Sequence, residues 1–83
     1  MATDGRTPAE CAVERERQYR RSIGQWNRSG DWDALLDALE HACVAQLSWL
    51  DAGNEELAKR ADGAREHVRD MIWAWLPGVP RKA

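Results

Sequence analysis

Apolar residues recur every three or four positions along residues 31–51, a stretch without Pro, Gly, Lys or Arg. At 100° per residue, these positions cover more than half of the circumference of a helix. The centre of this apolar arc holds Trp32, Leu36, Leu39, Cys43, Leu47 and Leu50, and one side of it adds Leu35, Ala38, Ala42 and Trp49. A helix on one neighbour shows a narrower stripe, so we predict a central helix flanked on two sides.

Weaker apolar patterns on either side predict two further helices. Thr7, Pro8 and Glu10 are typical of an N-cap, a first helical residue and a capping box. Gly30 and Gly53 break the pattern, and such short connections make consecutive helices antiparallel neighbours. We therefore predict an all-α fold, an antiparallel three-helix unit with helices over about 8–28, 31–52 and 54–76. The single domain spans residues 7–76, between a flexible lead (1–6) and a tail (77–83).

The length and composition predict a small globular unit that gains stability by association. The chain has 83 residues, of which 43% are hydrophobic and 31% charged. A chain this short buries little surface alone, and the first helix adds few large apolar residues. We therefore predict that two copies pair into a helical-bundle homodimer, with the second and third helices of each copy forming a four-helix arrangement and the first helix outside it. The alternative is an elongated hairpin dimer with the first helix partly loose.

The charge balance excludes some classes of partner. A net charge of −2 argues against bulk attraction to nucleic acid or to an anionic membrane. No apolar run approaches the ~20 residues that span a bilayer, and the N-terminus lacks the apolar core of a secretory signal. We expect a cytoplasmic protein that does not enter a membrane.

Acidic and basic residues are unevenly distributed along the chain. Residues 31–57 contain seven acidic residues and no basic ones, whereas residues 1–30 contain six Arg and residues 58–83 contain six basic residues. One interpretation is that neighbouring helices attract each other through these charges. The other is that Arg17, Arg21 and Arg28 form a stripe on the first helix that contacts phosphates or an acidic partner.

The titratable residues do not form a recognisable catalytic or metal pattern. His41 and Cys43 point about 200° apart on a helix, and their spacing from Cys11 and His67 matches no zinc motif. Cys43, at the centre of the arc, is interpreted as a small core residue. We therefore predict no cofactor, no metal and no enzymatic activity.

Arg60 and His67 have the R-x(4–6)-H spacing that resembles the helical ribonucleases of the HEPN class. In that class, Arg and His act on RNA at a dimer interface. The resemblance implies a third possible function, a ribonuclease-like toxin component.

Trp73 is predicted to point away from the core of the third helix, whereas Trp75 is predicted to point inward. An outward indole near a helix end is typical of a protein interface, although the C-terminal segment folding over it is the alternative. We expect Trp26 and Trp32 to pack together at the first turn. The expected interface residues are Trp73, Trp49, Met71 and Leu76, with Asp33, Asp37 and Glu40 as an acidic surface on the central helix.

These features favour a small non-enzymatic protein-interaction module, such as an adaptor, a chaperone-like factor or an inhibitor, that binds a larger protein. Its size and composition would suit a regulator from a bacterium or a mobile element. The alternative is a nucleic-acid-associated regulatory protein that uses the arginine stripe.

Overall fold

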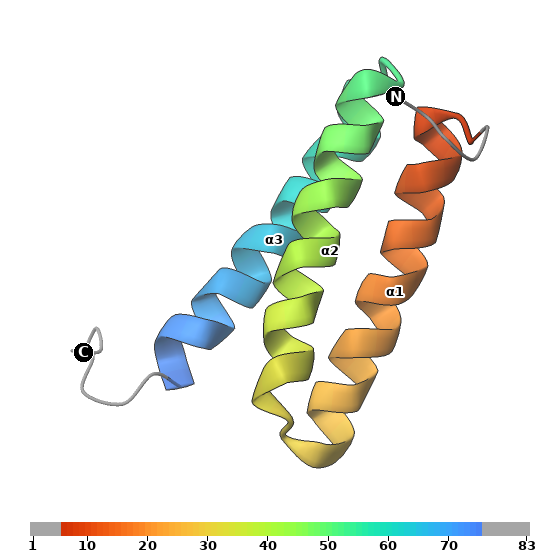
Figure 1. Ribbon diagram of the computed structural model, residues 1–83. Helices are drawn as coiled ribbons and strands as arrows, with labels where there is room; N and C mark the ends of the chain where they lie inside the picture. The colour runs from red at the N-terminus through yellow and green to blue at the C-terminus, as the bar shows by residue number, and fades with distance from the viewer. Residues whose placement is uncertain (1–5, 76–83) are drawn as a thin grey trace.

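The computed structural model describes residues 6–75, which form three helices and no strand. They are α1 (Pro8–Ser29), α2 (Trp32–Asp51) and α3 (Glu55–Trp75). Each helix runs antiparallel to the next (Figure 1). The predicted all-α three-helix unit is confirmed, with helix ends within one residue of the expected ones. Residues 1–5, Leu76 and the expected tail lie outside the described residues.

The start of α1 is fixed by its own local sequence. The Thr7 hydroxyl accepts a hydrogen bond from the Glu10 backbone N–H at 3.2 Å, and the Glu10 carboxylate accepts one from the Thr7 N–H at 2.9 Å. Pro8 occupies the first turn, where no backbone donor is needed. The predicted capping box is confirmed.

Both connections between helices use a glycine with positive φ followed by a capping side chain. Gly30 has φ 68° and Gly53 has φ 77°, a conformation that costs glycine little. The Asp31 carboxylate accepts from the Asp33 N–H at 3.0 Å, and the Asn54 side-chain oxygen accepts from the Leu57 N–H at 3.0 Å. These predicted helix boundaries are confirmed.

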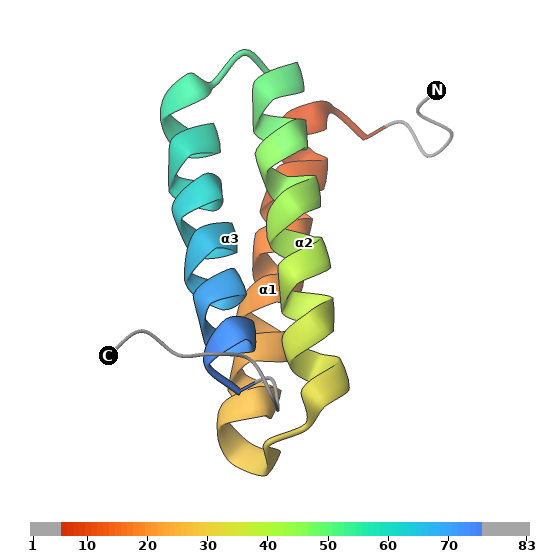
Figure 2. The same cartoon turned by 90° about the vertical axis from the view of Figure 1, so that its left-hand side faces the viewer.

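α2 lies between the other two helices and packs along both, whereas α1 and α3 touch each other little (Figures 1 and 2). The contact of α1 with α2 is more extensive than that of α3 with α2. The alternative of a partly loose first helix is therefore wrong.

The buried face of α2 is the alanine-rich side of its apolar arc and not the centre of the arc. Its buried residues are Ala34, Leu35, Ala38, Ala42, Ala45 and Trp49. The expected centre of the arc faces outward instead: Leu36, Leu47 and Leu50 are exposed, and Cys43 is half-buried. The interpretation of Cys43 as a core residue is corrected in the same way.

The alanine side of α2 is the buried one because the residues that face it on α1 and α3 are small. α1 contributes Ala12 and α3 contributes Ala58 and Ala61 to the buried contacts. Alanine on both sides lets helix backbones approach closely and excludes water from the contact. Leucines on the other side of α2 would hold the helices further apart.

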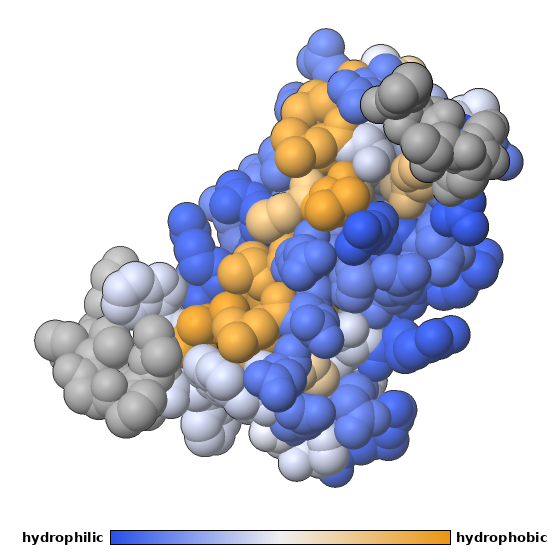
Figure 3. Space-filling model, viewed as in Figure 1, coloured by the Kyte–Doolittle hydropathy of each residue, from blue (hydrophilic) through white to orange (hydrophobic). Residues whose placement is uncertain are grey.

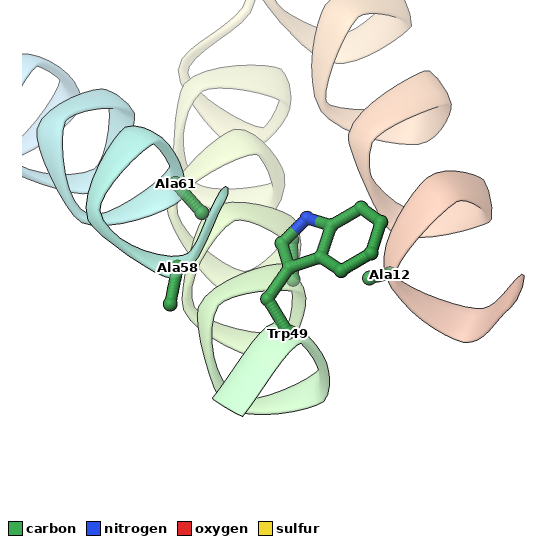
Figure 4. Packing of buried hydrophobic residues seen from close by; sticks show 5 residues of the cluster. Ala12, Trp49, Ala58 and Ala61 are labelled. Carbon is green, nitrogen blue, oxygen red and sulfur yellow. The ribbon is translucent and has the colours of Figure 1, made fainter. Parts of the chain in front are cut away.

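The core consists of two clusters along the length of the molecule. In the first, the indole of Trp49 lies between α1 and α3 and packs against Ala12, Ala58 and Ala61 (Figure 4). In the second, Leu35, Ala38 and Val68 are buried, and larger half-buried residues surround them: Tyr19, Ile23, Trp26, Trp32, Leu39, Met71 and Ile72.

One further expectation about burial is wrong, because Trp75 was expected to point inward but is 62% exposed. Val13 of α1 is exposed as well. On α3, Gly63 faces open space, and a Cβ placed on it would meet nothing within 4 Å.

Candidate interaction surfaces

An apolar stripe runs along the outer face of α2. Leu36 is 42% exposed, Leu47 62% and Leu50 49%. Leu39 and Cys43 are half-buried between them, and we call these five residues the leucine stripe. Figure 3 shows apolar surface running along α2 between charged flanks. Three exposed leucines on one helix face form the kind of contiguous apolar patch that marks an interaction surface.

Charged residues lie on both sides of the leucine stripe. Asp33, Asp37 and Glu40 are exposed on α2, as the sequence predicted. On the other side, Glu55, Lys59 and Asp62 of α3 line a groove of about 280 Å³ that reaches Leu50. A partner on this face meets an apolar centre with a polar rim, the usual anatomy of a protein interface.

Four tryptophans gather at the end of the molecule where α1 and α3 finish and α2 begins. The ring centroids of Trp26 and Trp32 are 6.1 Å apart in an edge-to-face arrangement, which confirms the predicted contact. Trp75 makes a similar contact with Trp26 at 6.3 Å. Trp73 is 55% exposed, which confirms its outward direction. We call Trp26, Trp32, Trp73 and Trp75 the tryptophan end.

The edge-to-face contact with Trp26 holds the Trp75 ring in position, although its side chain is exposed. Such aromatic pairs add about 0.5–1.5 kcal/mol beyond the area that they bury. Trp73 has no such ring contact among the described residues, and its side chain is 55% exposed.

The other expected interface residues have different positions. Met71 is half-buried against the second core cluster, so only part of it is accessible. Leu76 lies outside the described residues. Trp49 was expected at an interface but is buried among the three helices, because the alanines of α1 and α3 leave room for its indole.

Trp49 belongs to a polar network that connects all three helices. Its Nε1–H donates to Glu16 Oε2 at 3.0 Å, and Arg60 Nη2 donates to the two Glu16 oxygens at 2.7 and 2.9 Å. The Glu16 side chain is only 15% exposed. α1 thus holds a carboxylate between an indole of α2 and a guanidinium of α3.

The donors around Glu16 determine its protonation. Burial alone would raise the pKa of Glu16, but the hydrogen bonds from Arg60 and Trp49 and the charges of Arg60 and Arg20 outweigh it. The pKa therefore lies below its ordinary value of 4.5. The sequence pattern of α1 does not reveal the partners of Glu16 on the two other helices.

A groove of about 240 Å³ runs between α1 and α3, and Ala42 and Ala45 of α2 form part of its lining. Glu16, Tyr19 and Arg60 line it as well. Ligand sites for small molecules usually enclose about 300–1,000 Å³, and the Glu16 carboxylate is already bonded to Arg60 and Trp49. The groove is therefore a minor feature of the surface.

The proposed arginine stripe is exposed but already interacts within α1. Arg17 pairs with Glu14 at 2.9 Å, and Arg28 donates to Gln25 at 3.3 Å. Arg21 is exposed as well. The pairing of Arg17 reduces the positive charge that this face presents to phosphates.

The charge segregation leads to few ion pairs between helices. Arg15 lies 3.8 Å from Glu40 of α2, and Arg60 pairs with Glu16. Three further ion pairs lie within one helix: Arg17 with Glu14, Arg65 with Asp62, and Arg69 with Glu66.

The residues considered for catalysis or metal binding are dispersed. His41 Nδ1 accepts from Arg15 Nη1 at 3.0 Å, whereas His67 is exposed on α3 and Arg60 is bound to Glu16. Cys11 and Cys43 are both free thiols. No group of three or more His, Cys, Asp or Glu in the described part of the chain is placed to hold a metal ion. None of the helices within residues 6–75 is both long and apolar enough to span a membrane.

Comparison of the chain with protein-family models, characterised proteins and solved structures gives no match. The leucine stripe and the tryptophan end are the two apolar surfaces that the chain offers to a partner.

Proposed function

We propose that this chain is a non-enzymatic protein-interaction module that binds a larger protein through its tryptophan end. The observation that carries the proposal is the 55% exposure of Trp73 in the last turn of α3, the helix end at which Trp75 contacts Trp26. Tryptophan is enriched among the residues that contribute most to interface energy, because it fills a pocket with little loss of conformational entropy.

The chemistry of the partner follows from the surroundings of this surface. Asp33 and Asp37 are exposed in the first turns of α2, next to Trp32. The complementary surface is an apolar pocket that accepts an indole and carries Lys or Arg on its rim. Charges on a rim mainly accelerate association and select the partner. A module of this kind acts as an adaptor, a chaperone-like factor or an inhibitor by covering a surface of its partner.

The test compares three forms of the chain in quantitative capture from the native host. Wild type, Trp73→Ala and the control Val13→Ala are immobilised at equal density, and bound proteins are measured by mass spectrometry. Val13 is the matched control because it is an exposed apolar residue on α1. We expect a protein captured by wild type and Val13→Ala but reduced at least about tenfold with Trp73→Ala, the factor that corresponds to ~1.4 kcal/mol.

A direct titration then separates this proposal from nucleic-acid binding. The captured protein is purified and titrated against wild type and the double variant Asp33→Asn/Asp37→Asn. The variant should associate more slowly, and the difference should shrink as salt is added. If instead DNA or RNA binds wild type with a steep salt dependence and Arg17→Ala/Arg21→Ala removes that binding, the arginine stripe is the functional surface and the proposal is wrong.

A further inference from the structure

The leucine stripe has the same spacing when read from either end. Leu36 and Leu50 each lie seven residues from Cys43, and Leu39 and Leu47 each lie four residues from it. Both spacings return a helical residue to the same face. The stripe is therefore symmetric about Cys43, both in the positions of its residues and in their chemistry.

We propose that the leucine stripe docks on the leucine stripe of a second copy of this chain, antiparallel to it, about a two-fold axis that passes by Cys43. In this arrangement Leu36 of one copy lies against Leu50 of the other, and Leu39 lies against Leu47. The two Cys43 side chains meet at the axis. A two-fold interface uses the same patch on both copies, and an antiparallel pair brings together residues at equal distances on either side of the axis, which in this stripe are leucines.

The exposure of the leucines indicates that this face lacks a partner within the single chain. α1 and α3 cover the alanine side of α2, whereas Leu36, Leu47 and Leu50 remain 42–62% exposed. Spacings of three and four residues also match the knobs that pack between facing helices in bundles. The smallest side chain, Cys43, lies at the centre, where two crossing helices approach most closely.

The size of the face corresponds to a small and weak dimer interface. From Leu36 to Leu50 the helix rises about 21 Å, and α2 with α3 beside it is about 20 Å wide, which gives about 400 Å² of projected face per copy. Accessible area on a ridged surface exceeds its projection, so the face approaches the ~600 Å² per copy of the smallest stable interfaces. The expected dimer is therefore weak enough to dissociate on dilution. Its centre is the two α2 helices, with α3 beside each of them.

This inference uses a different face from the proposed function and is tested on purified protein alone. Sedimentation of the wild-type chain at tens of micromolar should give the mass of a dimer. Leu47→Glu places a carboxylate in the stripe and should raise the dissociation constant at least about tenfold. The matched control Val13→Glu puts the same charge on an exposed apolar position of α1 and should leave the dimer intact. Circular dichroism checks that both variants keep their helicity.

A monomer at this concentration would overturn the proposal, as would equal dissociation constants for Leu47→Glu and Val13→Glu. Because Leu47 is 62% exposed in the single chain, its replacement by Glu does not disturb the core. A loss of association with unchanged helicity therefore reports on the interface itself.

Disulfide trapping tests the two-fold axis. In a Cys11→Ser background, diamide should oxidise the two Cys43 thiols of a dimer to one disulfide, transferring two electrons and two protons to the reagent. A covalent dimer on a non-reducing gel, absent from Leu47→Glu at the same concentration, supports the axis. Failure to trap Cys43 in a chain that sediments as a dimer would contradict it.

The orientation is tested by moving the cysteine. With both natural cysteines replaced by Ser, Leu36→Cys and Leu50→Cys variants of different mass are mixed and oxidised. An antiparallel pair gives the mixed disulfide, and each variant alone gives little. A homodimer formed efficiently by Leu36→Cys alone would show a parallel pair and refute the antiparallel arrangement.

Discussion

Replacing Glu16 by Gln tests whether the network between the three helices contributes to stability. The Glu16 carboxylate accepts from the Trp49 indole and from Arg60, and its side chain is 15% exposed. A hydrogen bond to a charged group contributes about 1.5–3 kcal/mol, but the Arg60 side chain is 61% exposed, so solvent reduces its share. Gln keeps one acceptor oxygen for one donor. We therefore expect Glu16→Gln to lower the free energy of unfolding by about 1–2 kcal/mol at neutral pH.

The lowered pKa of Glu16 predicts how the stability cost of Glu16→Gln changes with pH. The pKa of Glu16 is lowered in the folded chain because the donors that hold its charge outweigh the opposing effect of burial. The ionised Glu16 contributes its full share of the folding stability above its ordinary pKa of 4.5. This contribution is lost as the pH falls through the lower pKa that Glu16 has in the folded chain. The difference in the free energy of unfolding between wild type and Glu16→Gln should therefore be largest at neutral pH and disappear in acid.

The assay is urea denaturation followed by circular dichroism at several pH values. Protein concentration is held fixed, because association adds apparent stability. Glu14→Gln is the matched control, since the partners of Glu14, Arg17 and Gln18, lie within α1, and it should cost less than Glu16→Gln, under about 1 kcal/mol. The reasoning is refuted if the two variants are equally stable, or if the cost of Glu16→Gln persists unchanged in acid.

Two further predictions concern the core and the glycines. Leu35 is fully buried, so Leu35→Ala should lower the free energy of unfolding in urea by ~2–5 kcal/mol, and a loss under about 1 kcal/mol would contradict its core position. Gly63 lies inside α3 with open space at its Cβ position, so Gly63→Ala should raise the thermal midpoint through a gain of about 0.5–1 kcal/mol. The same change at Gly53, where φ is 77°, should lower the midpoint, and the same direction of change at both glycines would disprove the argument.

The sequence predicts the helices and their ends well because these depend on local interactions. Thr7 and Glu10 form their reciprocal hydrogen bonds within four residues, and the left-handed conformation of Gly30 needs no distant partner. The direction of Trp73 also follows from the helical period alone.

The buried side of α2 could not be predicted from the same pattern. The hydrophobic arc gives greatest weight to its leucines, whereas packing selected the alanines, because Ala12 and Ala58 on the neighbours permit a close approach there. Trp49 illustrates the same limit. Its large apolar surface fits an interface or a core equally well, and only the position of Glu16 on another helix decides between them.

Which apolar residues stay exposed depends on how the three helices pack against one another. Trp75 stays at the surface because its contact with Trp26 is edge-to-face rather than enclosed. The sequence predicted more apolar circumference on α2 than two neighbours cover, and the exposed leucines confirm this.

The alanine side of α2 acts as a spacer that sets the width of the whole molecule. Ala38, Ala42 and Ala45 are almost completely shielded from water, so even two additional methyl groups at any of them would wedge a neighbouring helix away. That displacement would also pull Glu16 away from the indole and the guanidinium that it joins. The small alanines of this chain are therefore the residues with the least freedom to vary, whereas the exposed Leu36, Leu47 and Leu50 can change without altering the fold of the chain.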